Sequence, residues 1–332
     1  MSHDVLTIAC RHYDRTAAIL RGEVGVPGVD LRPVEMTDVA ALFTGLHSGE
    51  FDVSEMSLGE LVYAVSRGSN DFLAIPVFPF RMFRHGFMFC GAGFGGPLDV
   101  DGKRVALPRV VQTAGIWMRG LLTEEYGASP AATEWLYGSV HHWENGDGHE
   151  GDVTPQDGSV LRLLGAPSDR AHVAIEQALV QGEVDVLCTT RVPAAATDGS
   201  GRVRRLFEDY AAVEAGYFER SRIFPIMHTV AVRREAMEAH PELPKRLFEA
   251  FVEAKRRGNE RLNADASVGL AWKDSYVERE RALFGGDPWA YGLAKNRLVV
   301  EKFLAYCYDQ GVAARRLRVE ELFAPGTPEL IE

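Results

Sequence analysis

Two short stretches of the chain place acid–base and charged groups directly after segments that are predicted to be buried strands. Apolar residues at 52–58 predict one strand, and residues 72–79 predict another. The groups that end or follow these strands are Glu55, Ser57, Arg81, Arg84 and His85. Side chains just past the carboxyl ends of strands line the ligand crevice in open α/β sheets, so these would suit a small anionic substrate that gives or takes a proton. The alternative is a strand end with ordinary solvated charges.

Three further strand or helix ends carry groups of the same kind. Arg15 lies in the turn between a predicted strand, residues 5–10, and the helix that follows it. Arg191 follows the predicted strand 184–188, and Thr113 opens a predicted helix, where free backbone N–H groups favour an anion. Several guanidiniums in one cleft would bind a ligand with more than one carboxylate or phosphate, because Arg pairs with such groups in a bidentate way.

The order of the predicted elements indicates an α/β protein. The first part of the chain alternates strand and helix with short loops, which is typical of a parallel, doubly wound sheet. A second strand–helix unit begins near residue 98, and 332 residues are too many for one simple core. We therefore expect two α/β lobes with a cleft between them, a preferred place for small-molecule sites. His228 interrupts an apolar segment, residues 223–232, and is either a cleft residue or a satisfied core histidine.

Composition and charge exclude several classes of function. Acidic residues outnumber basic ones by 47 to 36, giving a formal net charge of −11, whereas nucleic acids and anionic membranes require a basic surface. No apolar run approaches the roughly 20 residues that span a bilayer. The first residues lack a secretory signal pattern, and the four cysteines are far apart without metal-ligand spacing. These features predict a soluble, cytoplasmic protein with reduced cysteines.

Residues 141–150 form the one stretch that invites a metal site. The potential ligands in it are His141, His142, Glu144, His149 and Glu150. Their spacing, with Gly and Asp between them, fits neither the HExxH pattern nor a CxxC-based site. We therefore expect a polar loop and no bound metal.

Ten segments, spread over nearly the whole chain, carry a family resemblance. They are ACRHYDRT (9–16), EFDVSEMSL (50–58), FLAIPVFPFRMFRH (72–85), GKRVALP (102–108), QTAGIWMRGLL (112–122), GEVDVL (182–187), RVRRLFEDYAAVE (202–214), IFPIMHTVAVRR (223–234), GDPWAYG (286–292) and ARRLRVEELFAP (314–325). With these segments the chain resembles the 4,5-dihydroxyphthalate decarboxylase family, whose fold is that of the type II periplasmic binding proteins. It departs from the family pattern at Arg11 and His12, where a small or different residue is usual. It also departs at 144–152, where ENGDGHEGD replaces Gly-Gly-x-Glu-x-Pro-Gly-Arg.

The resemblance implies a fold and an activity. The fold would have a discontinuous first lobe, residues 1–95 plus 228–332, and a second lobe, residues 96–227. The activity would be removal of CO2 from a hydroxylated aromatic dicarboxylate, most directly 4,5-dihydroxyphthalate to protocatechuate, by protonation of the carboxylated ring carbon. No cofactor is required, because the ring is its own electron sink. The resemblance also suggests a homo-oligomer and a small aromatic carboxylate substrate. The acidic charge balance predicts no nucleic-acid or membrane partner.

Within this scheme the candidate residues take defined roles. His85 or His228 would donate the proton, and Glu55 would orient the histidine or take a proton. The substrate-binding residues would be Arg15, Ser57, Arg81, Arg84, Thr113 and Arg191, with Arg191 closing from the second lobe.

Two other functions fit the same pattern of residues. One is a solute-binding protein for a small carboxylate, which would use the same cleft without chemistry. The other is a different cytoplasmic enzyme on this fold, such as a menaquinone-pathway or pyrimidine-synthase relative. The segments FPFRMFRH and FPIMH favour the decarboxylase family over that relative.

Overall fold

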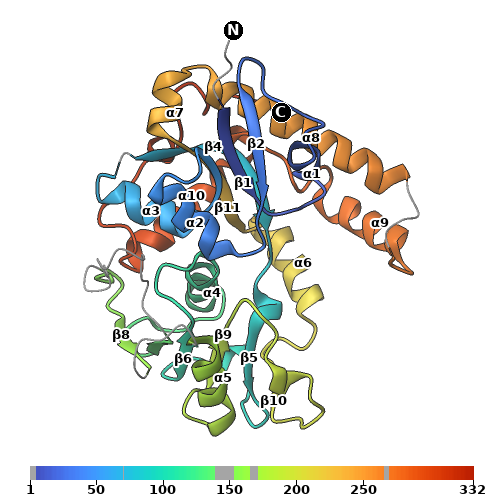
Figure 1. Ribbon diagram of the computed structural model, residues 1–332. Helices are drawn as coiled ribbons and strands as arrows, with labels where there is room; N and C mark the ends of the chain where they lie inside the picture. Colours follow the sequence, from blue (N-terminus) through green and yellow to red (C-terminus); the bar gives the residue numbers. More distant parts are fainter. Residues whose placement is uncertain (1–4, 70, 139–152, 165–170, 265–268) are drawn as a thin grey trace.

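The computed structural model describes residues 5–69, 71–138, 153–164, 171–264 and 269–332. These residues form two β-sheets at opposite ends of the molecule, with helices packed on both (Figure 1). The architecture is the two-lobed α/β arrangement expected from the sequence. No helix in the described ranges is both long and apolar enough to cross a bilayer.

The helices and strands alternate along most of the chain. The first sheet contains β1 (Val5–Cys10), β2 (Asp30–Glu35), β3 (Val53–Ser57), β4 (Phe72–Arg81) and β11 (Ile226–Arg233). The second contains β5 (Met88–Gly91), β6 (Arg104–Leu107), β7 (Glu134–Tyr137), β8 (Val160–Leu163), β9 (Val186–Cys188) and β10 (Val203–Arg205). The helices are α1 (Ala17–Leu20), α2 (Val39–Ser48), α3 (Leu58–Ser66), α4 (Thr113–Glu124), α5 (Ala171–Gln181), α6 (Tyr210–Ser221), α7 (Arg234–Ala239), α8 (Leu243–Ala264), α9 (Lys273–Phe284) and α10 (Leu293–Asp309).

In the first sheet, β11 lies between β3 and β4, which are neighbours in the sequence; the strand order is β2-β1-β3-β11-β4. β1 is parallel to β2 and β3, whereas β11 is antiparallel to both of its neighbours. The register places His228 opposite Ser57 and Val230 opposite Glu55. Side chains two residues apart point to the same face of a sheet. Glu55, Ser57 and His228 therefore share one face at the carboxyl end of β3.

The second sheet has the order β10-β5-β9-β6-β7-β8, with β5 antiparallel to β9 and β10. The chain therefore changes sheets between Arg81 and Met88, before the predicted boundary at residue 95, because β5 finds its partners in the second sheet. Between β10 and β11 the chain returns to the first sheet. The two segments that cross between the sheets are hydrogen-bonded to each other, because the Met82 N–H donates to the Pro225 carbonyl at 3.0 Å. The division into lobes at the predicted residues remains a prediction.

Alternating apolar residues on the strands build cores on both faces of each sheet. In the first sheet, Ile8 and Val230 face a core with α1 and α8, while Ala9 and Ala231 face the opposite core. In the second sheet Ala106 packs against α5. The core around Ala9 and Ala231 continues through α3, α4 and α10 into the second sheet, so the two lobes share it.

Helix α4 is the main link between the lobes in this shared core. The indole N–H of Trp117 donates to the Ile226 carbonyl of β11 at 2.9 Å, and the Trp117 ring packs on Phe303 of α10. Gly120 lets the Tyr306 ring approach the same helix, since a Cβ at Gly120 would come within 2.3 Å of that ring. The position of α4, and of the residues at its start, is therefore set by the first lobe.

Replacing Trp117 by Phe should lower the free energy of unfolding by about 1 to 3 kcal/mol, because it leaves the buried Ile226 carbonyl without its donor. Urea denaturation followed by circular dichroism would measure the change. The matched control is Trp272→Phe, because Trp272 is 70% exposed; there the change should stay within about 0.5 kcal/mol. Equal effects of the two substitutions would contradict the linking role of Trp117.

Candidate active site

The end of β4 is shaped by a large irregularity in its pairing with β11. Val230 pairs with Ile75, but His228 pairs with Phe80, so the β4 residues between them have only Thr229 opposite. Both prolines of the segment IPVFPF fall here, at a place that spares them from donating to a neighbouring strand. The Thr229 hydroxyl donates to the carbonyls of Ile75 and Val77, 3.0 and 3.1 Å away. This irregularity brings Phe80 beside His228.

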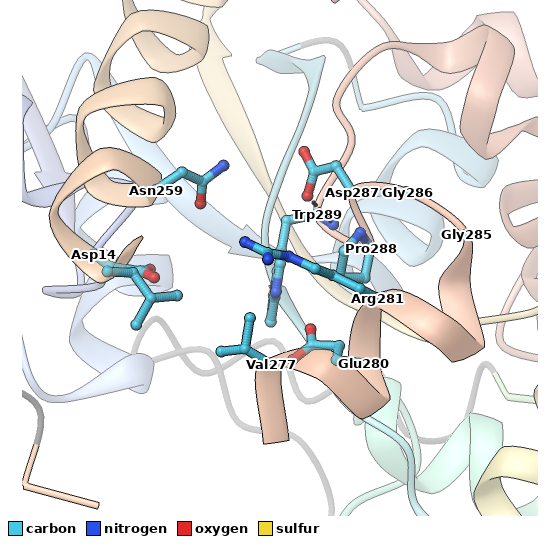
Figure 2. Close-up of a pocket in the computed structure, with 11 residues that line it drawn as sticks. Asp14, Asn259, Val277, Glu280, Arg281, Gly285, Gly286, Asp287, Pro288 and Trp289 are labelled. Atoms are coloured by element: carbon cyan, nitrogen blue, oxygen red, sulfur yellow. Dashed lines mark hydrogen bonds between the residues drawn. The ribbon is translucent and has the colours of Figure 1, made fainter. Parts of the chain in front are cut away.

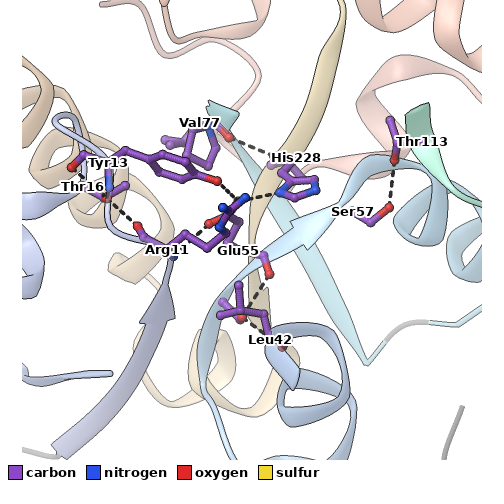
Figure 3. A network of polar contacts seen from close by, with 12 residues as sticks. Arg11, Tyr13, Thr16, Leu42, Glu55, Ser57, Val77, Thr113 and His228 are labelled. Carbon is purple, nitrogen blue, oxygen red and sulfur yellow. Dashed lines mark hydrogen bonds and ion pairs between the residues drawn. The ribbon is translucent and has the colours of Figure 1, made fainter. Parts of the chain in front are cut away.

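Glu55 is the centre of a buried polar network at the end of β3 (Figure 3). Its side chain is fully buried. Oε1 lies 2.5 Å from His228 Nδ1 and accepts a hydrogen bond from the Tyr13 hydroxyl at 2.8 Å; Oε2 accepts from the Arg11 backbone N–H at 3.0 Å. Burial would raise the pKa of the Glu55 carboxyl, but hydrogen bonds from His228, Arg11 and Tyr13 and the charge interaction with His228 outweigh it and lower the pKa. Glu55 is therefore a carboxylate that orients an imidazole.

Phe80 provides an aromatic surface around which this network is arranged. The Tyr13 ring stacks on it at 6.0 Å between centroids, and the His228 ring meets it edge-on at 5.1 Å. The guanidiniums of Arg11 and Arg84 lie 5.8 and 5.9 Å from the same ring centre. The arrangement joins an apolar ring, two cations and a histidine held by a carboxylate, which suits an aromatic anion.

The basic residues after β4 are buried, so the alternative of solvated strand-end charges is wrong for them. Arg81, Arg84 and His85 are 4%, 3% and 0% exposed. The Arg81 guanidinium donates to the Ala290 carbonyl at 3.0 Å and to the Asn296 side chain, which ties β4 to the start of α10. Burial lowers the pKa of Arg81 to about 10.

Arg84 has no carboxylate within ion-pair distance in the described ranges. Its Nε contacts the Met227 sulfur at 3.2 Å. Burial lowers the pKa of Arg84 to about 10, and the Glu214 carboxylate acts on it in the opposite direction. A buried guanidinium is costly unless an anion compensates it, so Arg84 is the residue of this group best suited to an anionic ligand.

Arg15 is held against the back of the same network. Its Nε donates to the Pro79 carbonyl at 2.6 Å, and its Nη1 pairs with Asp14 at 2.7 Å. The guanidinium lies 4.6 Å from the Tyr13 ring centre and 3.7 Å from that of Trp289. Arg15 thereby packs against the Tyr13 ring and holds the Pro79 carbonyl, which directly precedes Phe80.

Two helix starts, one from each lobe, meet beside Glu55. Ser57 precedes α3 and Thr113 opens α4; their hydroxyl oxygens lie 2.8 Å apart, and the Gly59 N–H donates to Thr113 at 2.9 Å (Figure 3). A Cβ at Gly59 would come within 2.4 Å of the Val111 carbonyl, so only glycine permits this approach. Both helices direct backbone N–H groups to this point, which favours an anion.

His85 lies in an aromatic pocket, apart from the Glu55 network. Its ring contacts Tyr126, Phe207 and Tyr217, and neither ring nitrogen has a hydrogen-bond partner in the described part of the chain. Burial, with a smaller contribution from the Arg220 charge, lowers the pKa of His85 to about 4. The structure thus brings one of the two candidate histidines, His228, to a carboxylate.

The remaining predictions concern Arg191 and the 141–150 loop. Arg191 is exposed after β9, and its charge acts on Glu176 of α5. The 141–150 loop lies outside the described residues. Within the described ranges no group of three or more His, Cys, Asp or Glu side chains is arranged to hold a metal ion.

Comparison with known proteins places the chain in a family. No protein-family model matches it. It is 34% identical to the 4,5-dihydroxyphthalate decarboxylase of Comamonas testosteroni, in an alignment of 340 residues that covers 99% of each chain. The chain belongs to the 4,5-dihydroxyphthalate decarboxylase family. A Pseudomonas putida protein of the same name is 29% identical over 215 residues, which cover 61% of this chain and 77% of that one. The family resemblance of the sequence segments is confirmed.

Solved structures show the fold of this family member. The alkanesulfonate-binding protein SsuA from Xanthomonas axonopodis pv. citri, bound to MOPS, matches with a TM-score of 0.54 and 14% identity over 98% of this chain and 99% of that one. The periplasmic aliphatic sulphonate-binding protein SsuA from Escherichia coli matches with a TM-score of 0.53 and 13% identity over 97% and 98%. The periplasmic-binding-protein-like fold expected from the sequence is confirmed.

A cavity of about 560 Å³ lies elsewhere, between α8, α9 and residues 285–289 (Figure 2). The polar side chains in its lining are Asp14, Asn259, Glu280, Arg281 and Asp287. Burial raises the pKa of Glu280, and the neighbouring carboxylates raise it further. Trp289 is also in the lining, and the Arg15 guanidinium lies 3.7 Å from the centre of its ring. The lining therefore combines carboxylates with one guanidinium, whereas the Glu55 network holds a histidine paired with a carboxylate.

Three residues of the network were missed by the sequence analysis as site residues: Arg11, Tyr13 and Phe80. Arg11 and Tyr13 follow β1 in the segment ACRHYDRT, whose position after a strand was the available signal. Nothing in the local sequence marked Phe80 as a site residue, because its position beside His228 depends on the irregular pairing of β4 with β11.

Thr113→Val should lower the free energy of unfolding by about 1 to 3 kcal/mol, because it leaves the Gly59 N–H and the Ser57 hydroxyl without their partner. The matched control is Thr133→Val. Thr133 is also buried, but its hydroxyl has no hydrogen-bond partner in the described ranges, so its replacement should be neutral or stabilising. Urea unfolding of both variants measures the change. If Thr133→Val lowered the free energy of unfolding as much as Thr113→Val, the proposed contribution of the contact between the helix starts would be contradicted.

Proposed function

We propose that this protein is a carboxy-lyase that removes CO2 from a hydroxylated aromatic dicarboxylate, with 4,5-dihydroxyphthalate as substrate and protocatechuate as product. The observation that carries the proposal is the Glu55–His228 pair, 2.5 Å apart and set against Phe80, in a chain of this family. A carboxylate-held histidine supplies the proton that the reaction consumes. Arg84 supplies positive charge for an anionic substrate.

The substrate's own electrons allow the reaction to proceed without an electron-sink cofactor. Each hydroxyl of 4,5-dihydroxyphthalate is para to a carboxylate. When a proton is added at the carboxylated ring carbon, the para oxygen becomes a carbonyl and its hydrogen passes to solvent. When the bond to the carboxylate breaks, its electron pair returns to the ring, CO2 leaves, and the oxygen regains a proton. The protein has to provide the first proton and hold the ring in place.

In this proposal His228 is the proton donor and Glu55 its orienting partner. Because Nδ1 of His228 is engaged with Glu55 Oε1, Nε2 is the nitrogen that delivers the proton. The hydrogen bonds from Arg11 and Tyr13 keep Glu55 a carboxylate. In that form it stabilises the imidazolium and does not itself need to contact the substrate. Such a general acid contributes typically about 10²- to 10⁴-fold to a rate.

Substrate binding in this proposal combines an aromatic surface with charges. The ring lies against Phe80, and the carboxylates pair with Arg84 and with the positive, N-terminal ends of α3 and α4. The predicted substrate contacts at the helix starts are Ser57 and Thr113, and Arg191 remains the proposed contact from the second lobe. Arg15 and Arg81 hold the wall of the site through their bonds to backbone carbonyls.

A solute-binding protein on the same fold is the main competing function. Binding alone needs charges and an aromatic surface, but it does not need a histidine held by a buried carboxylate. That pair favours an enzyme. Incubation with 4,5-dihydroxyphthalate and a panel of hydroxybenzoates, with CO2 measured, separates the two, because tight binding without product would support the binding protein. CO2 released only from a substrate outside the phthalates would favour another enzyme on this fold.

We further propose that the protein acts in the cytoplasm in phthalate degradation, as a homo-oligomer. Its four cysteines are free and buried, which fits a reducing compartment. Size-exclusion chromatography with light scattering would test the oligomeric state.

His228→Asn should reduce CO2 release from 4,5-dihydroxyphthalate by about 10²-fold or more while leaving substrate binding measurable, because the proton donor is lost. Single-turnover assays give the rate, and isothermal titration calorimetry gives the affinity. The matched comparison is His85→Phe, which keeps the aromatic pocket and should retain turnover. A collapse of activity in His85→Phe alone would move the proton donor to His85, and near-normal rates in both variants would reject histidine as the donor.

Arg84→Met should raise KM for 4,5-dihydroxyphthalate by about 10- to 100-fold. A charge-assisted hydrogen bond contributes about 1.5 to 3 kcal/mol, and each 1.4 kcal/mol is about tenfold in affinity. The control is Arg162→Met on the edge strand β8, where the exposed arginine pairs with Glu134; KM should not change there. An unchanged KM in Arg84→Met would show that the substrate carboxylate binds elsewhere.

A further inference from the structure

Two donors share a single oxygen in the Glu55 network. The Tyr13 hydroxyl and His228 Nδ1 both approach Glu55 Oε1, at 2.8 and 2.5 Å, while Oε2 has the Arg11 backbone N–H. The Tyr13 ring is fixed independently of this bond, since it stacks on Phe80 at an interplanar angle of 11° and packs against the Arg15 guanidinium. The packing of the ring therefore directs the Tyr13 hydroxyl toward the Glu55 carboxylate.

We propose that Tyr13 is a positioning residue that sets the acidity of His228 by competing with it for Glu55 Oε1. The inference rests on the proposed function, in which His228 is the proton donor. Each hydrogen bond that Glu55 accepts disperses part of its charge, so a bond from Tyr13 weakens the hold of Glu55 on the His228 proton. A donor held less tightly gives up its proton more readily to the ring carbon.

The other side chains around Glu55 and His228 do not compete with His228 for Glu55 Oε1. From β1 and the turn after it come the Cys10 thiol, which burial keeps protonated, and the cations of Arg11 and Arg15 beside Tyr13. From β3 comes Ser57, and from α2 comes Phe43, which meets the His228 ring edge-on. From β4 comes Phe80, with the Arg84 cation beyond it. Of the described side chains, Tyr13 and His228 are those that donate to Glu55.

The direction of the effect follows from the geometry. Without the Tyr13 hydroxyl, the Glu55 charge is available to His228 alone, and the imidazolium is stabilised. The pKa of His228 then rises. Because the reaction needs the protonated imidazole, the alkaline limb of the rate profile should move to higher pH. The rate on the plateau should fall, because a weaker acid transfers its proton more slowly.

Tyr13→Phe tests this, since it keeps the ring on Phe80 and removes the hydroxyl alone. In histidine-labelled protein, with His228 assigned by the loss of its signal in His228→Asn, NMR titration should show the pKa of His228 rising by about 0.5 to 1, the equivalent of one ordinary hydrogen bond. The alkaline limb of kcat/KM should move by the same amount, and the plateau should fall by a factor of about three to ten.

The matched control is Tyr306→Phe, which removes another hydrogen bond from a tyrosine to a glutamate, Glu124, away from the site. It should leave the pKa of His228 and the pH profile unchanged. Should Tyr13→Phe not fold, 3-fluorotyrosine at position 13, a stronger donor, should lower the pKa of His228.

A pKa of His228 that stays constant or falls in Tyr13→Phe would overturn the proposal, as would an equal rise in Tyr306→Phe. The NMR titration does not depend on turnover. Loss of the proposed function, seen as full activity in His228→Asn, is therefore distinguishable from failure of the Tyr13 proposal.

Discussion

A carboxylate with no exposed surface is the constraint on which this site depends. Glu55 lies at the end of a buried strand, where an ion is unstable unless its oxygens are fully hydrogen-bonded. Its partners come from two places in the chain: the turn after β1, which supplies the Tyr13 hydroxyl and the Arg11 N–H, and β11, which supplies His228. Satisfying one buried charge therefore fixes the relative positions of two strands and a turn. The imidazole that results is pre-oriented before any substrate arrives.

The shared core gives the site a rigid frame and limits how it can open. Trp117 and Tyr306 hold α4 against the first lobe, so the start of α4 belongs mechanically to the lobe that carries Glu55. The strands of the second sheet are linked to the first by two adjacent crossings. A relative motion of the lobes would therefore leave α4 with the first lobe and preserve the Ser57–Thr113 contact.

Much of the fold and part of the site could be predicted from the sequence, because strand ends and family segments are local features. Glu55, Ser57 and Arg84 were found as groups following apolar runs. The choice between His85, which follows an apolar segment, and His228, which lies within one, could not be made from the local sequence. It depends on which strand pairs with β3. Likewise, Arg81 and Arg84 differ by three positions in the sequence, but the irregular pairing of β4 directs Arg81 to Asn296 and leaves Arg84 near Phe80.

The insertion of β11 between β3 and β4 also has a consequence for biosynthesis. Glu55 and His228 are 173 residues apart, which at about 5–20 residues per second means roughly 10 to 35 seconds of translation. During that interval β3 and β4 have emerged from the ribosome with open edges, and the Glu55 carboxylate lacks its imidazole. Open strand edges invite pairing with other chains. The order of synthesis thus leaves β3 and β4 of the first sheet without their shared partner until β11 has been made.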